Sequence, residues 1–269
     1  MLTNTTHLKN FAIRATDGEL GTVAEFYFDD ETWGIRYLVV DTGGWLDGRK
    51  VLISPISVIR TDWQARQLDV SLTKKQVESS PDINTREPVS RQHEASYLGY
   101  YGYGNYWGGP YMWGPSYYPG DLAIPPAVTT ARATADRIRM QSIDSHLRSS
   151  DRVTGYHIDA SDGEIGHLNG FVMDDDAWAI RYIEVATRNW WPGKKVLVSP
   201  AWIERVSWEN SKVYVALTRE AIQNGPAYDE SLPITREYEN RLYFHYGRPP
   251  YWLQERESRP SVLRAGLSI

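Results

Sequence analysis

The chain has 269 residues, a formal net charge of −5 and no cysteine. Its length allows two domains that each bury a core, and its acidic balance disfavours general binding of nucleic acid. The absence of cysteine excludes disulfides and thiolate-ligated metal sites, and no run approaches the roughly 18 apolar residues of a membrane helix. We therefore expect a cytoplasmic protein without a transmembrane segment, because the first residues also lack a secretory signal pattern.

Short strands separated by turns are predicted for the first part of the chain, about six in all. Asp17-Gly18 is a hairpin signal, because both residues tolerate positive φ. A second turn is predicted at residues 29–32, before a strand at 33–42 that is rich in aromatic and β-branched residues. Pro55 ends the next strand, because proline cannot donate a ladder hydrogen bond. The pattern predicts an all-β barrel or sandwich, and closure into a barrel would remove the exposed strand edges. A short helix is predicted over residues 73–79.

An aromatic segment at residues 97–118 follows these strands. Glycines and prolines separate its rings, so no single helix or strand can bury them all on one face. Two interpretations stay open: the rings pack onto the barrels, or they form a surface for recognition or self-association. The candidate interaction anchors are these residues and their C-terminal echo: Tyr97, Tyr100, Tyr101, Tyr103, Tyr106, Trp107, Tyr111, Trp113, Tyr117, Tyr118, Tyr246, Tyr251 and Trp252.

The second half of the chain repeats the first at an offset of 145 residues, without a gap, from Leu8–Trp107 to Val153–Trp252. Of these 100 aligned positions, 35 are identical, which indicates a duplication. The match continues through the aromatic tail, so the duplicated unit carried that tail with it. The repeat pairs that we single out are Asp17 with Asp162, Gly18 with Gly163, Trp33 with Trp178, and Arg36 with Arg181.

The repeat and the composition between its copies predict a domain division. Residues 121–130 are rich in proline and alanine and are predicted as a linker, and a helix is predicted over residues 131–147. We divide the chain into a first barrel domain, a linker rich in Tyr, Gly and Trp, a second barrel domain and an aromatic C-terminal tail. Their bounds are 1–95, 96–148, 149–238 and 239–269.

The repeated motifs resemble the PRC-barrel family. They are Asp-Gly-Glu followed by Leu or Ile and Gly, then Asp-Asp-x-x-Trp-x-Ile-Arg-Tyr, then Lys-Val-Leu followed by Ile or Val and Ser-Pro. The resemblance covers roughly residues 8–80 and 153–225, and it implies two tandem all-β domains. The family includes the cytoplasmic domain of the photosynthetic reaction-centre H subunit, the C-terminal domain of a ribosome maturation factor and many stand-alone bacterial proteins. It implies docking onto other macromolecules without chemistry of its own.

Polar motifs offer few candidate sites. The acidic turns at residues 29–31 and 174–176 could bind a hard cation, but adjacent acids cannot all face one ion, so we favour solvated hairpin turns. Arg36 and Arg181 lie inside apolar strands, where a charge needs a partner. We favour a structural pair with a carboxylate from the preceding turn or from Glu19 or Glu164, over an anion receptor. The sequence shows no catalytic motif, no metal site and no cofactor fingerprint.

These observations predict a non-enzymatic protein-interaction or scaffold protein that self-associates, as a homo-oligomer, or docks onto a macromolecular complex. Two alternatives stay open through the family resemblance. One is a peripheral subunit of a photosynthetic or electron-transfer membrane complex, as the H subunit is. The other is a factor associated with RNA or the ribosome, although nucleic acid is a disfavoured partner.

Overall fold

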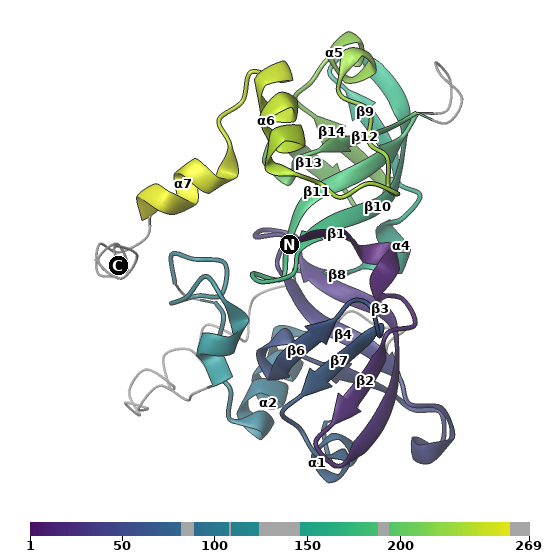
Figure 1. Cartoon of the computed structure of the whole chain (residues 1–269), viewed down its shortest axis with the longest axis vertical. Helices are drawn as coiled ribbons and strands as arrows, with labels where there is room; N and C mark the ends of the chain where they lie inside the picture. Colours follow the sequence, from purple (N-terminus) through teal and green to yellow (C-terminus); the bar gives the residue numbers. More distant parts are fainter. Residues whose placement is uncertain (82–88, 108, 124–145, 188–193, 259–269) are drawn as a thin grey trace.

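Two β-sheets with the same strand order dominate the computed structural model, which describes residues 1–81, 89–107, 109–123, 146–187 and 194–258 (Figure 1). The first sheet has the order β5-β4-β3-β2-β7-β6 and the second the order β12-β11-β10-β9-β14-β13. Among the described strands, β2 with β7 and β9 with β14 pair in parallel, and the other pairs are antiparallel. The prediction of two mainly β domains with about six strands each is confirmed in its strand content, whereas the predicted closure into barrels depends on the pairing at the sheet edges.

The first sheet contains β2 (Ala12–Ala15), β3 (Gly18–Asp29), β4 (Ile35–Asp41), β5 (Lys50–Ile53), β6 (Val58–Asp62) and β7 (Gln67–Val70). The second contains β9 (His157–Ala160), β10 (Gly163–Asp174), β11 (Ala179–Ala186), β12 (Lys195–Val198), β13 (Ile203–Ser207) and β14 (Lys212–Val215).

The long strands β3 and β10 each pair with the strand before and the strand after them in the chain, and a glycine in each lets the backbones approach closely. A Cβ atom at Gly21 would lie 2.0 Å from the carbonyl oxygen of Asp41, and one at Gly166 would lie 2.1 Å from that of Ala186. Both glycines also have a positive φ, which L side chains rarely adopt. The last glycine of the repeated motif, Gly21 or Gly166, therefore lets the backbones of two neighbouring strands come into contact.

Strand pairing leaves each sheet path open, so the predicted closure by hydrogen bonds is not found among the described residues. The open ends are β5 and β6, joined by the 3₁₀ helix η3 (Pro55–Ser57), and β12 and β13, joined by η5 (Pro200–Trp202). In the first half, the Tyr97 hydroxyl forms hydrogen bonds with backbone groups at the open edge of β5. It donates to the carbonyl of Leu52 at 3.1 Å and accepts from the amide of Ser54 at 3.1 Å.

Each half lends a short strand to the other half. The strand β1 (Leu2–Asn4) pairs with β10 of the second sheet, and β8 (Leu147–Ser149) pairs with β3 of the first. The registers are equivalent, because Leu2 faces Asp174 and Leu147 faces Asp29. This reciprocal exchange, at the offset of 145 residues, relates the halves by an approximate two-fold axis. Each sheet thereby gains a seventh strand.

The repeated tryptophans form the contact at this axis. Trp33 and Trp178 have left-handed backbones, with φ of 60° and 50°, a conformation that costs a bulky residue about 1–3 kcal/mol. It turns their carbonyl groups towards the opposite half. The amide of Ile180 donates to Trp33 O and the amide of Ile35 donates to Trp178 O, both at 2.8 Å. The strain thus accompanies two hydrogen bonds between the halves.

The helices α2 (Arg91–Tyr101), α6 (Arg236–His245) and α7 (Tyr251–Ser258) lie on the left of the view in Figure 1, whereas α4 (Ser150–Val153) lies on the right and α1 and α5 lie at the two ends of the molecule. The predicted helix near residue 73 is confirmed, as is its repeat, and Thr73 and Thr218 cap them. The boundaries drawn at 95 and 238 fall inside α2 and α6, and the helix predicted over 131–147 lies almost wholly outside the described residues, with Leu147 in β8. No helix within the described ranges is long and apolar enough to span a membrane. The helices are α1 (Lys74–Glu78), α2 (Arg91–Tyr101), α4 (Ser150–Val153), α5 (Arg219–Asn224), α6 (Arg236–His245) and α7 (Tyr251–Ser258), with the 3₁₀ helices η1 (Thr5–Leu8), η2 (Gly43–Leu46) and η4 (Pro119–Ala123).

Candidate interaction site

A buried arginine lies where the first sheet meets the aromatic segment. Arg36 is 1% exposed and donates from Nη2 to the Thr32 hydroxyl at 2.7 Å, with Asp29 at 3.6 Å. Its guanidinium carbon lies 4.0 Å from the ring centroid of Tyr106 and 4.6 Å from that of Trp113. The predicted pairing with the preceding acidic turn is confirmed, and the aromatic rings add cation–π contacts that stabilise the buried charge.

A buried glutamate from α2 completes this first cluster. Glu94 is fully buried, ion-pairs with Arg91 at 3.1 Å and accepts hydrogen bonds from the hydroxyls of Tyr37 and Tyr106. Burial raises the pKa of the Glu94 carboxyl to about 7, against the opposing effect of Arg91. The cluster therefore fixes α2 and Tyr106 onto the sheet through charged and hydroxyl groups.

The second half builds the same cluster from the repeated residues. Arg181 pairs with Asp174 at 3.0 Å, and its guanidinium carbon lies 4.2 Å from the Tyr251 ring centroid. Glu239 accepts from the Tyr182 hydroxyl at 2.7 Å and pairs with Arg236 at 2.9 Å. The equivalent of Trp113 is missing here. Instead, Glu255 of α7 binds Arg181 at 2.6 Å.

One small residue explains the different arginine positions. A Cβ atom at Gly34 would lie 2.9 Å from the guanidinium carbon of Arg36, so this arginine occupies space that only glycine leaves open. The repeat has Ala179 at the equivalent position. Arg181 is accordingly directed towards two carboxylates, whereas Arg36 is directed towards two aromatic rings.

Most of the candidate anchors pack against the sheets. Tyr97, Tyr106, Trp113 and Tyr246 are buried, and only Tyr100 and Tyr118, at 42% and 40%, are exposed. The interpretation that the rings cover the barrels therefore describes most of this segment, and a recognition role for them stays a prediction. The remaining anchors are half-buried: Tyr101, Tyr103, Trp107, Tyr111, Tyr117, Tyr251 and Trp252.

The acidic turns join the two halves. Asp29 caps the amides of Glu31 and Thr32, as predicted. The prediction that the turns are solvated is wrong for their middle residues, because Asp30 binds Arg148 at 2.7 Å and Asp175 binds the Trp63 indole at 2.8 Å. The carboxylates of residues 174–176 do lie close together, but those of Asp174 and Asp175 are already engaged by groups of the chain.

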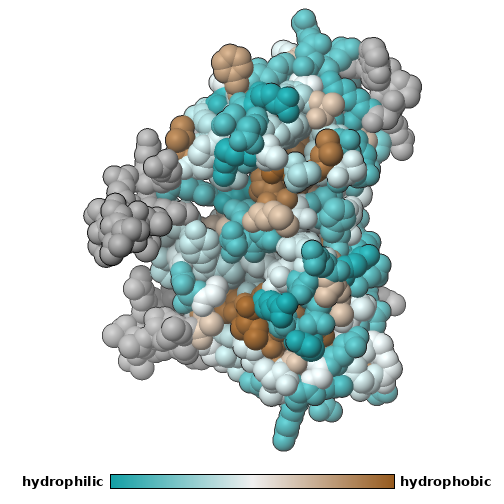
Figure 2. Space-filling model, in the orientation of Figure 1, coloured by the Kyte–Doolittle hydropathy of each residue, from teal (hydrophilic) through white to brown (hydrophobic). Residues whose placement is uncertain are grey.

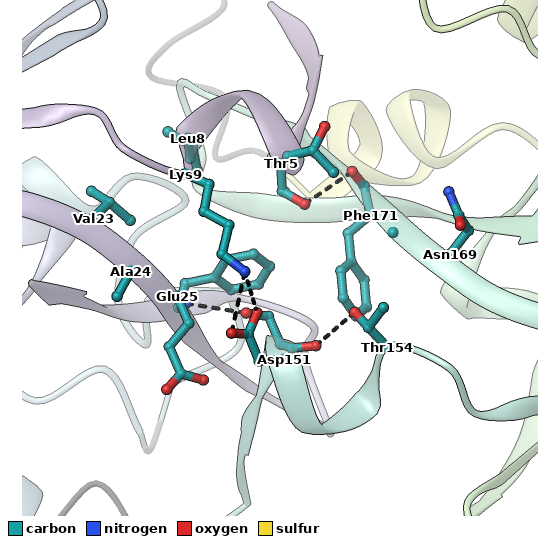
Figure 3. A pocket seen from close by; sticks show the side chains of 14 residues that line it. Thr5, Leu8, Lys9, Val23, Ala24, Glu25, Asp151, Thr154, Asn169 and Phe171 are labelled. Atoms are coloured by element: carbon teal, nitrogen blue, oxygen red, sulfur yellow. Dashed lines mark hydrogen bonds and ion pairs between the residues drawn. The ribbon is translucent and has the colours of Figure 1, made fainter.

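A small cavity of about 140 Å³ lies between the two halves (Figure 3). Residues of both halves form its walls. Lys9 reaches across to Asp151 at 3.2 Å, and the Thr5 hydroxyl donates to the carbonyl of Phe171 at 3.2 Å. These contacts join the two halves. The cavity is therefore part of the interface between them, next to the exchanged strands.

The sequence analysis missed three buried acids. The sequence carries a signal for Glu94 and Glu239. They are an identical pair of the repeat, and they lie in the segment that follows the strands in each half. Glu184 had no such signal, since its counterpart is Val39. It is fully buried and is bound by Asn4, Asn169 and Lys195 at 2.6–2.9 Å.

Comparison with known proteins identifies the first sheet. A family model described as the PRC-barrel domain matches residues 5–69. An uncharacterized protein of Deinococcus radiodurans is 35% identical over 74 residues, which are 28% of this chain and 26% of that protein. The chain thus spans about a quarter of the length of this relative. Residues 5–69 thus match the PRC-barrel domain, the family that the repeated motifs resemble.

Proposed function

We propose that this chain is a non-enzymatic interaction protein that docks onto a protein partner through the side that carries α2, α6 and α7, the helical side. The PRC-barrel domain supports a role in protein interaction generally. The buried arginine and glutamate side chains of both halves pair with each other or with other groups of the chain. We therefore look for the docking site on the outer surface.

The distribution of exposed apolar side chains supports this choice of side. Of the seven large hydrophobic residues that are exposed among the described residues, four lie in the helices and aromatic segments that follow the sheets: Tyr100, Tyr118, Phe244 and Leu253. Phe244 in α6 is 89% exposed. Apolar side chains of this size are typical anchors of protein interfaces.

The strand surface offers a suitable control residue. On the face shown in Figure 2, hydrophobic side chains occur as separate small patches among hydrophilic ones. Ile59 on β6 is 67% exposed and belongs to strand surface. It matches Phe244 as an exposed apolar side chain, but it lies outside the helices.

Photo-crosslinking in the native cell tests this proposal. We expect Phe244→p-benzoylphenylalanine to give a defined adduct with one protein, and Ile59→p-benzoylphenylalanine to give little or none. Mass spectrometry of the adduct distinguishes a foreign partner from a second copy of this chain. Equal labelling at both positions, or no adduct at Phe244 in native cells, would contradict docking through the helical side.

A further inference from the structure

The second half has a cavity where the first half has a tryptophan. Trp113 is fully buried, donates from its indole to the carbonyl of Ala177 at 2.7 Å and lies beside Arg36. In the second half, a cavity of about 250 Å³ lies beside Arg181. Its walls include Tyr117 and Tyr118 from the aromatic segment and Tyr251, Trp252 and Glu255 from α7.

The local backbone explains why the second half lacks its own tryptophan here. Residues 109–116 form a tight loop with bridges between Tyr111 and Gly114 and between Trp113 and Ser116. In the repeat, the equivalent residues 254–258 belong to the helix α7, and Ser258 stands at the position equivalent to Trp113. Among the described residues, the guanidinium of Arg181 therefore makes a cation–π contact with one ring, that of Tyr251, where the guanidinium of Arg36 makes two.

We propose that this cavity binds a tryptophan side chain of a protein partner, with a basic residue next to that tryptophan in the partner's sequence. The guanidinium of Arg181 offers the cation–π contact that Arg36 makes with Trp113. The volume lies just below the range of about 300–1,000 Å³ typical of drug-sized ligands, which suits a single large side chain.

The charged side chains that line the cavity support a basic residue next to the tryptophan of the partner. The lining contains three carboxylates, Asp174, Asp176 and Glu255, and two guanidinium groups, Arg181 and Arg236. Both guanidinium groups already pair with carboxylates of the chain. The side chain of Asp176 is 79% exposed and lies 3.6 Å from the Met1 ammonium, whose shorter contact is with Asp175. Because this exposed pair is long and screened by water, a cation beside the inserted ring can still pair with Asp176, and an acidic partner segment would meet repulsion.

This inference rests on the proposed docking function and names one site for it. The probe is the chain's own loop sequence followed by two lysines, Gly-Pro-Tyr-Met-Trp-Gly-Pro-Lys-Lys, with 5-fluorotryptophan for ¹⁹F NMR titration into the full chain. The first control peptide carries alanine in place of the tryptophan and is followed by calorimetry. A second replaces both lysines by glutamate.

The protein variants are Tyr118→Ala and Arg181→Gln, with Tyr100→Ala as the matched control, because Tyr100 and Tyr118 are about equally exposed. We expect the tryptophan peptide to bind, and both cavity variants to weaken it about tenfold or more while Tyr100→Ala leaves the dissociation constant unchanged. Tyr118→Ala keeps the test decisive if Arg181→Gln does not fold.

Four results would overturn the inference. These are no binding of the tryptophan peptide, equal binding of the alanine peptide, tighter binding of the glutamate peptide, and binding that is insensitive to Tyr118→Ala. A defined adduct at Phe244 together with any of them would leave the docking function standing and reject this site alone. Free indole binding as tightly as the peptide would also reject a protein partner here.

Discussion

The two arginines of the repeat, Arg36 and Arg181, occupy the same position in the strand order and are stabilised differently. Arg36 is enclosed by the rings of Tyr106 and Trp113, and Arg181 is held by Asp174 and Glu255. Each arginine also pairs with the first aspartate of the preceding turn, Arg36 with Asp29 and Arg181 with Asp174. The duplicated scaffold therefore tolerates two ways of stabilising one buried cation.

The comparison also shows how a small change redirects a large side chain. Glycine at position 34 lets the guanidinium of Arg36 approach the backbone, and alanine at position 179 denies that approach. The first half then closes its site with an aromatic loop. The second half keeps a cavity whose wall includes a carboxylate from α7.

The largest effect is expected from removing each arginine charge. Arg36→Met leaves Asp29, whose side chain is 6% exposed, without its cation, and we expect a loss of about 3–5 kcal/mol in the free energy of unfolding. Arg181→Met should cost about half as much, because Asp174 and Glu255 are 20% and 25% exposed and gain solvation from water. Urea denaturation of both variants measures this. An equal or larger loss for Arg181→Met would mean that the deeper burial of Asp29 does not determine the cost of losing the arginine.

The second prediction concerns pH. The pKa of Glu94 is raised to about 7 from 4.5, so the folded chain binds more protons than the unfolded chain between these pH values. The free energy of unfolding should therefore fall as pH rises from about 4.5 to about 7, by about 3 kcal/mol from this group. Glu94→Gln should remove that part of the pH dependence, as followed by urea denaturation at several pH values.

Glu239→Gln is the matched control for this measurement. Burial also raises the pKa of Glu239, but its partner Arg236 is 50% exposed, whereas the Arg91 that pairs with Glu94 is 8% exposed. We expect a smaller change in the pH dependence for Glu239→Gln. A Glu94→Gln profile parallel to that of the unmodified chain would show that Glu94 titrates near its ordinary pKa.

The exchanged strands provide a third, intermediate effect. Asn4 and Ser149 occupy equivalent positions, cap the following helices and each donate to a carboxylate of the opposite half. Asn4→Ala should cost about 1–3 kcal/mol, because it removes a partner from the fully buried Glu184. Ser149→Ala should cost less, since its partner Glu25 is only half-buried. Thermal unfolding compares the pair, and the opposite ranking would contradict the role given to Glu184.

The smallest effect is expected from exchanging the two small residues beside the arginines. Gly34→Ala should displace the guanidinium of Arg36 and cost about 1 kcal/mol, through crowding of a well-packed site. Ala179→Gly should change stability by about 1 kcal/mol or less, mainly through backbone entropy. Calorimetry gives both values. Stabilisation by Gly34→Ala would show that Arg36 does not need the space left by glycine.

The strands and turns were predictable because they depend on local patterns. Asp17-Gly18 marks a hairpin, Pro55 ends a strand, and Thr73 caps a helix, each through its own backbone preference. The pairing of Arg36 with the preceding turn also followed from a local rule, that a charge inside an apolar strand needs a nearby partner. Glu164, the alternative partner, binds His157 instead of Arg181.

The arrangement of the halves could not be predicted in this way. The exchanged strands β1 and β8 have three residues each, and their partners lie more than 100 residues away in the sequence. No periodic pattern of that length distinguishes exchange from pairing within one half. The placement of Trp113 was equally hidden, because a loop of glycine and proline does not fix which side its ring faces.

Amide hydrogen exchange at Ile35 and Ile180 tests the central claim most directly, namely that the two halves form one unit around an approximate two-fold axis. Each amide donates to the tryptophan carbonyl of the other half at 2.8 Å. We predict slow exchange at both amides, with protection equal to that of the central strands β3 and β10. Fast exchange at both, as for exposed turns, while the central strands stay protected, would show that the halves are joined by the linker alone.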